Sequence, residues 1–411
     1  MTCLAASPDS KWIATGSGDG TIIIWDAKSS AIIHEWLAHW GRVEDLNFSP
    51  HTASGPQRLV SAGGYSSGGE TLVVWELDRD EVSKVAVLAS IDAEKVRETF
   101  VNTCVWSPDG TLISAACQAG PVRVWDAVTF QQLASLLPGA DNLEPRPMHD
   151  IRSLQWSSDS CYLAWRYRTS EGCNLDSDCD EWAIWSPLTE ETPRRLPSHP
   201  IHPKAYTLNA LSFNPRPRSR HIATAIARKH PMAGAEGSEC SSVSDVQSYA
   251  HSGYVLIWDI VSGATLNVLV HARGVRNVSF PPDGRSLLSL SEDGSVQIWD
   301  SESWQDTTSL EGSGDGGTSW CACLSPNGKY VAVASNNYET STYTVQLWRT
   351  CPETLCAAVF QEHREWICRL AFSLDGECLA SGDAEGLVHI HRLSDVTGDS
   401  GLRCAHTVSL I

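Results

Sequence analysis

His271, Ser289, Asp293 and Trp299 include the three residue types of a hydrolytic triad. In such a triad the histidine deprotonates a serine hydroxyl, and the aspartate orients the histidine. The same residue types also form buried structural networks, in which each polar group satisfies another. Which of these two interpretations holds depends on the elements that position the four residues.

An acidic stretch suggests a second kind of chemistry, the binding of calcium. Asp176, Asp178 and Asp180 match the Asp-x-Asp-x-Asp start of a calcium-binding loop. Position six of such a loop is normally glycine and position twelve normally glutamate, but Glu181 and Pro187 stand there. We therefore expect a solvated acidic loop, and we expect no metal ion or other cofactor in this protein.

A periodic pattern of tryptophans indicates which elements position these residues. Seven short apolar runs end in tryptophan, and an eighth run ends in His391. The seven are Trp25, Trp75, Trp125, Trp185, Trp258, Trp299 and Trp348. A unit of roughly 40 to 50 residues with four short strands is typical of a β-propeller. We expect one all-β domain, a β-propeller that spans residues 1–411.

Each unit contains four strands, which we name a, b, c and d in chain order. In the unit from 275 to 309, the turn Pro281–Gly284 separates strands a and b, and Glu292–Gly294 separates strands b and c. We expect eight four-stranded blades, with seven blades plus an irregular terminal hairpin as the alternative. The expected blades are residues 1–38, 39–90, 91–137, 138–197, 198–270, 271–310, 311–361 and 362–411.

The turns and the ends of the c strands resemble those of the WD-repeat β-propeller family, and this resemblance covers essentially the whole chain. The Ser-Pro-Asp-Gly turn at 107–110 recurs in variant forms. The Trp-Asp pairs that close units are Trp25-Asp26, Trp125-Asp126, Trp258-Asp259 and Trp299-Asp300. The fold class is expected to follow from this resemblance, but the function is not, because one fold hosts many roles.

The resemblance implies a structural role for the candidate triad. His271, Ser289, Asp293 and Trp299 are expected to form a buried hydrogen-bond network that holds the b–c turn against the d–a loop. The last unit offers a similar set, His363, Ser381 and Glu385, with His391 in place of tryptophan. Other units lack one or more of these residues, so we expect their blades to depend mainly on apolar packing.

Ring closure differs from the family pattern, in which the N-terminal strand completes the last blade. The first unit already contains a strand a at residues 2–6, and the last unit contains a possible strand d at residues 404–410. We expect that the ring closes through side-chain packing between blades one and eight, or that an upstream segment is missing.

Composition limits the classes of partner and the cellular location. The net charge of −19 repels phosphate backbones and argues against nucleic acid. The chain lacks both a long apolar run for a membrane helix and the basic start of a secretory signal. Its 14 cysteines contain no Cys-x2-Cys pair and fall largely in strand patterns. We expect a cytoplasmic or nuclear protein that is not secreted; its oligomeric state is not indicated.

Unequal loop lengths indicate where a partner would bind. The b–c and d–a connections emerge at the same end of a four-stranded blade, and most long insertions belong to these two classes. The longest, residues 228–253, is expected to be a flexible loop because it is rich in Ser and Gly. Insertions on one face of a repeat protein commonly mark its binding face. The residues expected at this rim are Trp40, Arg42, Tyr65, Asp176, Asp178, Asp180, Tyr249, Trp320, Tyr338 and Trp366.

The sequence therefore predicts a non-catalytic scaffold that presents one loop-rich rim to a partner protein or peptide of unknown identity. One alternative is an enzyme or cofactor-binding propeller that uses the central channel. That class needs His, Asp and Arg near the starts of the a strands, where we expect mostly apolar or neutral residues.

A second alternative is a substrate receptor of a ubiquitin ligase. Family members of that kind often carry arginine two residues after the Trp-Asp pair. Lys28, Val128, Val261 and Glu302 stand at the equivalent positions here, which argues against this role.

Overall fold

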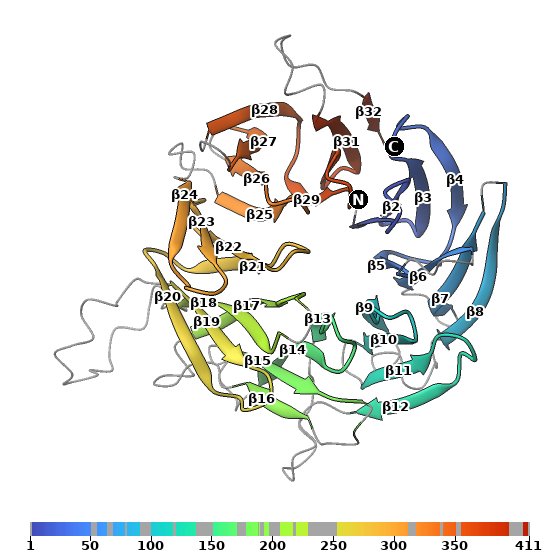
Figure 1. The fold of residues 1–411 in the computed structure, drawn as a ribbon. Helices are drawn as coiled ribbons and strands as arrows, with labels where there is room; N and C mark the ends of the chain where they lie inside the picture. The colour runs from blue at the N-terminus through green and yellow to red at the C-terminus, as the bar shows by residue number, and fades with distance from the viewer. Residues whose placement is uncertain are drawn as a thin grey trace.

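The computed structural model consists of eight four-stranded antiparallel sheets, arranged as blades around a ring (Figure 1). It describes residues 2–50, 56–63, 69–78, 80–90, 100–117, 121–136, 151–170, 178–187, 189, 193–196, 206–216, 219–228, 253–310, 318–337, 340–350, 355–393 and 406–409. The expected all-β propeller with eight blades is confirmed, and the seven-bladed alternative is wrong.

Every blade is built from four consecutive strands, with the first at the centre of the ring and the last at its outside (Figure 1). Blade one contains β1 (Cys3–Ala6), β2 (Trp12–Gly16), β3 (Thr21–Asp26) and β4 (Ile32–Leu37), and blade two contains β5 (Val43–Phe48), β6 (Gln57–Gly63), β7 (Glu70–Leu77) and β8 (Val82–Ser90). Blade three contains β9 (Val101–Trp106), β10 (Leu112–Cys117), β11 (Val122–Asp126) and β12 (Gln132–Leu136), and blade four contains β13 (Ile151–Trp156), β14 (Leu163–Ser170), β15 (Asp178–Trp185) and β16 (Arg194–Leu196). Blade five contains β17 (Tyr206–Phe213), β18 (His221–Arg228), β19 (Gly253–Asp259) and β20 (Thr265–His271), and blade six contains β21 (Val275–Ser279), β22 (Ser286–Ser291), β23 (Val296–Asp300) and β24 (Asp306–Leu310). Blade seven contains β25 (Thr318–Leu324), β26 (Tyr330–Asn337), β27 (Thr342–Arg349) and β28 (Leu355–His363), and blade eight contains β29 (Ile367–Phe372), β30 (Cys378–Asp383), β31 (Leu387–Arg392) and β32 (His406–Ser409).

The aspartate of each Trp-Asp pair organises the turn that follows strand c. In blade one, Asp26 Oδ1 accepts hydrogen bonds from the backbone N–H groups of Lys28 and Ser29, at 3.0 and 2.6 Å. The Ser29 hydroxyl donates to the same oxygen at 2.8 Å. A short acidic side chain that bonds to the backbone two and three residues ahead stabilises a turn. The Trp-Asp signature therefore has a structural cause, independent of any partner.

Apolar clusters join each blade to the next, and among the described residues one such cluster lies between every pair of neighbours. The cluster that closes the ring packs Ile13, Ile23 and Trp25 of blade one against Ala380 and Val388 of blade eight. No strand is shared between these two blades in the described sheets, since β1 pairs with β2 and β29 with β30. Side-chain packing thus joins blades one and eight, as we expected for a ring in which these blades share no strand.

The candidate triad of blade six lies inside the blade. Ser289 Oγ accepts a hydrogen bond from Trp299 Nε1 at 2.8 Å and lies 2.8 Å from His271 Nε2. The carboxylate of Asp293 accepts from the N–H and hydroxyl of Ser295, within its own turn. His271 and Ser289 are 2% and 0% exposed, so a substrate could not reach the serine.

Equivalent networks occur in two other blades. In blade two, Ser61 Oγ lies 2.8 Å from His39 Nε2 and accepts Trp75 Nε1 at 2.8 Å. In blade eight, His363 lies 2.8 Å from Ser381 Oγ and 2.9 Å from the carboxylate of Asp383. The expectation that Glu385 supplies the acid in that blade is wrong, because Asp383, at the end of β30, lies against the histidine instead.

Candidate functional site

Two classes of connection form each rim of the ring. The b–c and d–a connections share one end of the blades: Ala38 N donates to Gly20 O at 3.0 Å in blade one, and Ala384 N donates to Trp366 O at 2.9 Å in blade eight. The a–b and c–d connections share the other end, where Ala27 N donates to Lys11 O at 2.8 Å. We call these ends the d–a rim and the a–b rim.

A close backbone approach fixes the d–a connection between blades one and two. Gly20 has a φ of 95°, which strongly favours glycine. A Cβ atom at this position would lie 2.0 Å from His39 O and 2.7 Å from Gly41 O. The b–c turn of blade one therefore packs directly against residues 38–42 and restricts their position. His39 is also held by its bond to Ser61, so the segment is anchored on two sides.

The anchored segment presents two of the expected rim residues to solvent. Trp40 is 77% exposed, and the side chain of Arg42 is 56% exposed. Trp366, in the connection between β28 and β29, is half-buried. Tryptophan is among the residue types most enriched in binding hot spots, so an exposed indole on a fixed backbone is a candidate contact residue.

The structure places the other expected rim residues differently. Tyr65, Asp176, Tyr249, Tyr338 and the 229–252 stretch lie outside the described residues. Asp178 and Asp180 belong to β15, where they pair in register with Ser170 and Arg168, and Trp320 belongs to β25. The acidic segment was expected to be a loop, and this is wrong from position 178 onward, because the hairpin of β14 and β15 extends further than the apolar pattern suggests.

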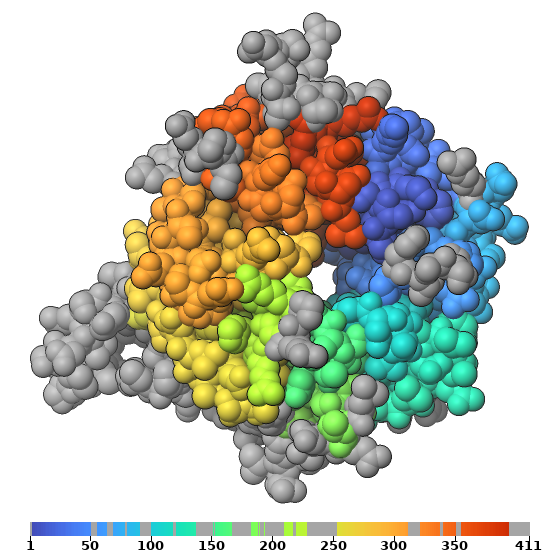
Figure 2. Space-filling view, viewed as in Figure 1, coloured from blue at the N-terminus to red at the C-terminus, as the bar shows by residue number. Residues whose placement is uncertain are grey.

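A pocket of about 790 Å³ lies on the inner wall of the ring, next to Arg42. Its lining comes from the inner strands of blades one to four and blade eight and from residues directly before these strands. Figure 2 shows that the ring is open at its centre. The lining residues are Thr2, Arg42, Glu44, Asp45, Asn47, Phe100, Asn102, Thr103, Cys104, Val105, Ser153, Leu154 and Arg369. We call this the central pocket.

The central pocket carries four charged side chains, Arg42, Glu44, Asp45 and Arg369. The other nine lining residues are apolar or neutral, which is the character that we expected for most residues near the a strands. Arg42 and Glu44 form an ion pair at 3.4 Å, and Arg369 lines the same pocket from blade eight. Burial raises the pKa of the Glu44 carboxyl, although Arg42 opposes this effect. Sequence reasoning missed Glu44, Asp45 and Arg369, because an alternating strand shows which residues share a face but not that this face lines a channel.

Several of these polar groups hold the inner strands together. Asp45 accepts hydrogen bonds from the Thr103 hydroxyl at 2.7 Å and from Cys104 N at 3.0 Å, both in the next blade. Asn102 Nδ2 donates to Ile151 O at 3.1 Å, which links blades three and four in the same way. Burial raises the pKa of Asp45, and these hydrogen bonds oppose it. The buried carboxyl thus has a structural use.

Cys104, which lines the pocket, and Cys3, which lies beside it, are not activated as nucleophiles. Burial raises the pKa of the Cys3 thiol to about 12 and that of Cys104 well above its ordinary value, whereas a nucleophilic cysteine needs a lowered pKa. Within the described ranges, no three His, Cys, Asp or Glu side chains come together as ligands for a metal ion. None of the described residues forms a helix whose length and apolar character would suffice for a membrane crossing.

Four segments of the chain match the protein-family model described as "WD domain, G-beta repeat": residues 1–26, 90–126, 263–300 and 354–392. The chain is similar to the nuclear distribution protein PAC1 of Gibberella zeae, with 24% identity over 316 residues, which is 76% of this chain and 62% of that protein. It is also 31% identical over 118 residues to WD repeat and SOCS box-containing protein 1 of Mus musculus, which is 29% of this chain and 25% of that protein.

Two further similarities are to a natural protein and to a designed one. A probable cytosolic iron-sulfur protein assembly protein 1 of Cryptococcus neoformans is 28% identical over 157 residues, 31% of this chain and 35% of that protein. The crystal structure of the computationally designed Ika8 protein superposes with a TM-score of 0.62 at 18% identity and covers 95% of this chain and 96% of its own. At that identity, the likeness to Ika8 supports the fold alone. The chain spans less than two thirds of the length of each of the three natural relatives.

Proposed function

We propose that this chain, a WD-repeat β-propeller with eight blades, is a non-catalytic scaffold that binds a partner protein or peptide at its d–a rim. The observation that carries the proposal is the anchored segment 38–42. It exposes Trp40 and Arg42 on a backbone fixed by Gly20, beside a charged central pocket. Its mechanism is preorganised display, in which the partner meets a surface that needs little further ordering.

The side chains of the rim indicate what kind of partner would bind there. Trp40 offers a large apolar face that would be desolvated on binding, and Arg42 offers a cation with a fork of donors. Glu44 adds a carboxylate at the pocket, next to Arg42. A partner segment of mixed charge with an apolar anchor fits this combination, because complementary charges improve specificity and association rate.

The relatives support an interaction role and an intracellular location. Their printed names refer to nuclear distribution and to cytosolic iron-sulfur protein assembly, which are processes inside the cell. We extend to this chain only a cytoplasmic or nuclear location. Because the matches cover only part of each relative, we do not extend the relatives' own activities to this chain.

A role as a ubiquitin-ligase substrate receptor is not included in the proposal. One relative's name refers to a SOCS box, but the match covers 25% of that protein. The positions where such receptors often carry arginine lie two residues after each Trp-Asp pair. In blades one and three these residues, Lys28 and Val128, donate backbone N–H groups to Asp26 and Asp126, and neither is arginine.

Affinity purification with a rim variant tests the proposal. We expect Trp40→Ala/Arg42→Ala to lose at least one protein that co-purifies with the intact chain, because the variant removes the exposed anchor and its neighbouring charge. The matched control is Leu266→Ala/Val268→Ala, which truncates two residues of β20 that are 49% and 46% exposed on the outside of blade five. Loss of the same proteins from both variants, or from neither, would remove the rim as the binding surface.

A further inference from the structure

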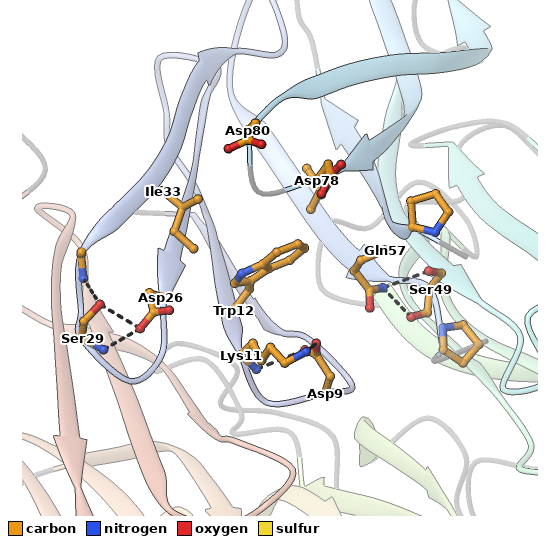
Figure 3. A pocket seen from close by; sticks show the side chains of 14 residues that line it. Asp9, Lys11, Trp12, Asp26, Ser29, Ile33, Ser49, Gln57, Asp78 and Asp80 are labelled. Atoms are coloured by element: carbon orange, nitrogen blue, oxygen red, sulfur yellow. Dashed lines mark hydrogen bonds and ion pairs between the residues drawn. The ribbon is translucent and has the colours of Figure 1, made fainter. Parts of the chain in front are cut away.

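A groove of about 860 Å³ lies on the a–b rim between blades one and two, at the end of the blades opposite to the d–a rim (Figure 3). It is bounded by the a–b turns and the c–d connections of both blades. Figure 3 shows the indole of Trp12 at its centre, with Asp26 on one side and Gln57 on the other. We call this feature the Trp12 groove.

The Trp12 groove has an apolar floor. Trp12 and Ile33 are partly buried and pack against the apolar cluster that joins blades one and two. Leu77 closes the floor from blade two, and Pro50 and Pro56 line the wall beside it. The indole makes a hydrophobic bottom that is wide enough for the methylene stem of a long side chain.

Carboxylates surround this floor. Among the described lining residues, four are acidic (Asp9, Asp26, Asp78 and Asp80) and one, Lys11, is basic. Lys11 forms an ion pair with Asp9 at 3.0 Å, so it adds no uncompensated positive charge. Asp78 and Asp80 are both exposed in the connection that follows β7. The described lining of the groove therefore has an excess of negative charge around an aromatic ring.

We propose that the Trp12 groove is a second docking site, which receives an extended peptide segment that carries Lys or Arg side chains. A Lys or Arg stem would lie along Trp12, where the ring also attracts the cation. Asp78 and Asp80 would bind its charged end. The net charge of −19 would further attract a basic segment. The site lies on the rim opposite to Trp40, so the scaffold would hold two partners at once.

A pair of labelled peptides tests this proposal. The probe is a nine-residue peptide, blocked at both ends, with arginine at every second position; its match carries citrulline in place of arginine. We expect the arginine peptide to bind in fluorescence anisotropy. Asp78→Asn/Asp80→Asn should weaken binding about fivefold, because the variant removes two exposed ion pairs with the arginine side chains. Trp12→Leu should weaken it by a similar factor through loss of the ring.

Two controls separate this site from general attraction and from the d–a rim. Glu302→Gln/Asp306→Asn removes the same number of exposed charges in blade six, and we expect less than about a twofold effect on affinity. Trp40→Ala/Arg42→Ala should leave peptide binding unchanged, so the two sites fail or succeed separately. The proposal would be overturned if Asp78→Asn/Asp80→Asn and Glu302→Gln/Asp306→Asn weakened peptide binding equally. It would also be overturned if the citrulline peptide bound as tightly as the arginine peptide. If Trp12→Leu does not fold, the exposed aspartate pair decides alone.

Discussion

Acidification from pH 7 to pH 5 should lower the free energy of unfolding by about 2 kcal/mol for each buried histidine of blade eight with a strongly lowered pKa. Burial lowers the pKa of His389 to about 4 and that of His391 to about 3, from an ordinary value of 6.5. As the pH falls below 6.5, these histidines bind protons in the unfolded chain but not in the folded chain. The stability is therefore present above pH 6.5, and it is lost between pH 6.5 and about 4 for His389 and between pH 6.5 and about 3 for His391.

The packing of blade eight explains why these rings stay neutral. The ring of His391 stacks on Phe360 with 3.8 Å between the centroids, and its side chain is 1% exposed. Neither of its ring nitrogens has a hydrogen-bond partner among the described residues. The carboxylate of Glu362 lies 3.6 and 3.7 Å from His389 and His391, which is too far to offset the cost of burying a charge.

Denaturant unfolding at several pH values measures this effect. His391→Phe keeps a stacked ring but removes one titrating group, so its loss of stability from pH 7 to 5 should be about 2 kcal/mol smaller than that of the unchanged chain. Trp258→Phe, at the equivalent position of β19, is the control; it should shift the stability without changing the pH dependence. An identical pH dependence for His391→Phe and the unchanged chain would show that His391 does not control acid sensitivity.

Replacing Ser289 by alanine should cost about 2–4 kcal/mol of stability, whereas replacing Ser114 should cost less than about 1 kcal/mol. Both serines are 0% exposed, and both lie in a b strand. Ser289 bonds to Trp299 and His271, and its removal leaves both buried partners unsatisfied. The hydroxyl of Ser114 has no partner among the described residues, so its removal leaves no group behind.

Thermal or denaturant unfolding of Ser289→Ala and Ser114→Ala under identical conditions measures the difference in their loss of stability. The register between strands b and c explains why blade three lacks the network. In blade six, Ser289 lies two residues after the residue that pairs with the closing tryptophan, and in blade three Ala115 occupies the same position. Equal destabilisation by Ser289→Ala and Ser114→Ala would mean that the network contributes nothing beyond packing.

Much of the fold was predictable from the sequence, because its signals are local. The spacing of the closing tryptophans, the Ser-Pro-Asp turns and the Trp-Asp pairs each report a physical constraint within one blade. The Ser7 hydroxyl, for example, donates to Asp9 at 2.7 Å and accepts Trp12 N at 2.9 Å. Ring closure could not be decided in advance, since Trp25 meets Ala380 only across the last interface.

The candidate site was less predictable, because it depends on contacts between blades. Trp40 and Arg42 could be placed at a rim from the position of the loop. The central pocket could not, since Asp45 and Arg369 come from blades far apart in the chain. The Trp12 groove was missed for the same reason: its walls combine the a–b turn of blade one with Asp78, at the end of strand c in blade two.

Hydrogen–deuterium exchange of the chain, alone and bound to the partner captured through it, tests most directly whether the d–a rim is the binding surface. The account predicts slower exchange of backbone amides in residues 38–43 and 364–367 on binding, and unchanged exchange in β20. Slower exchange confined to β20 and the other outer strands, with residues 38–43 unaffected, would contradict it.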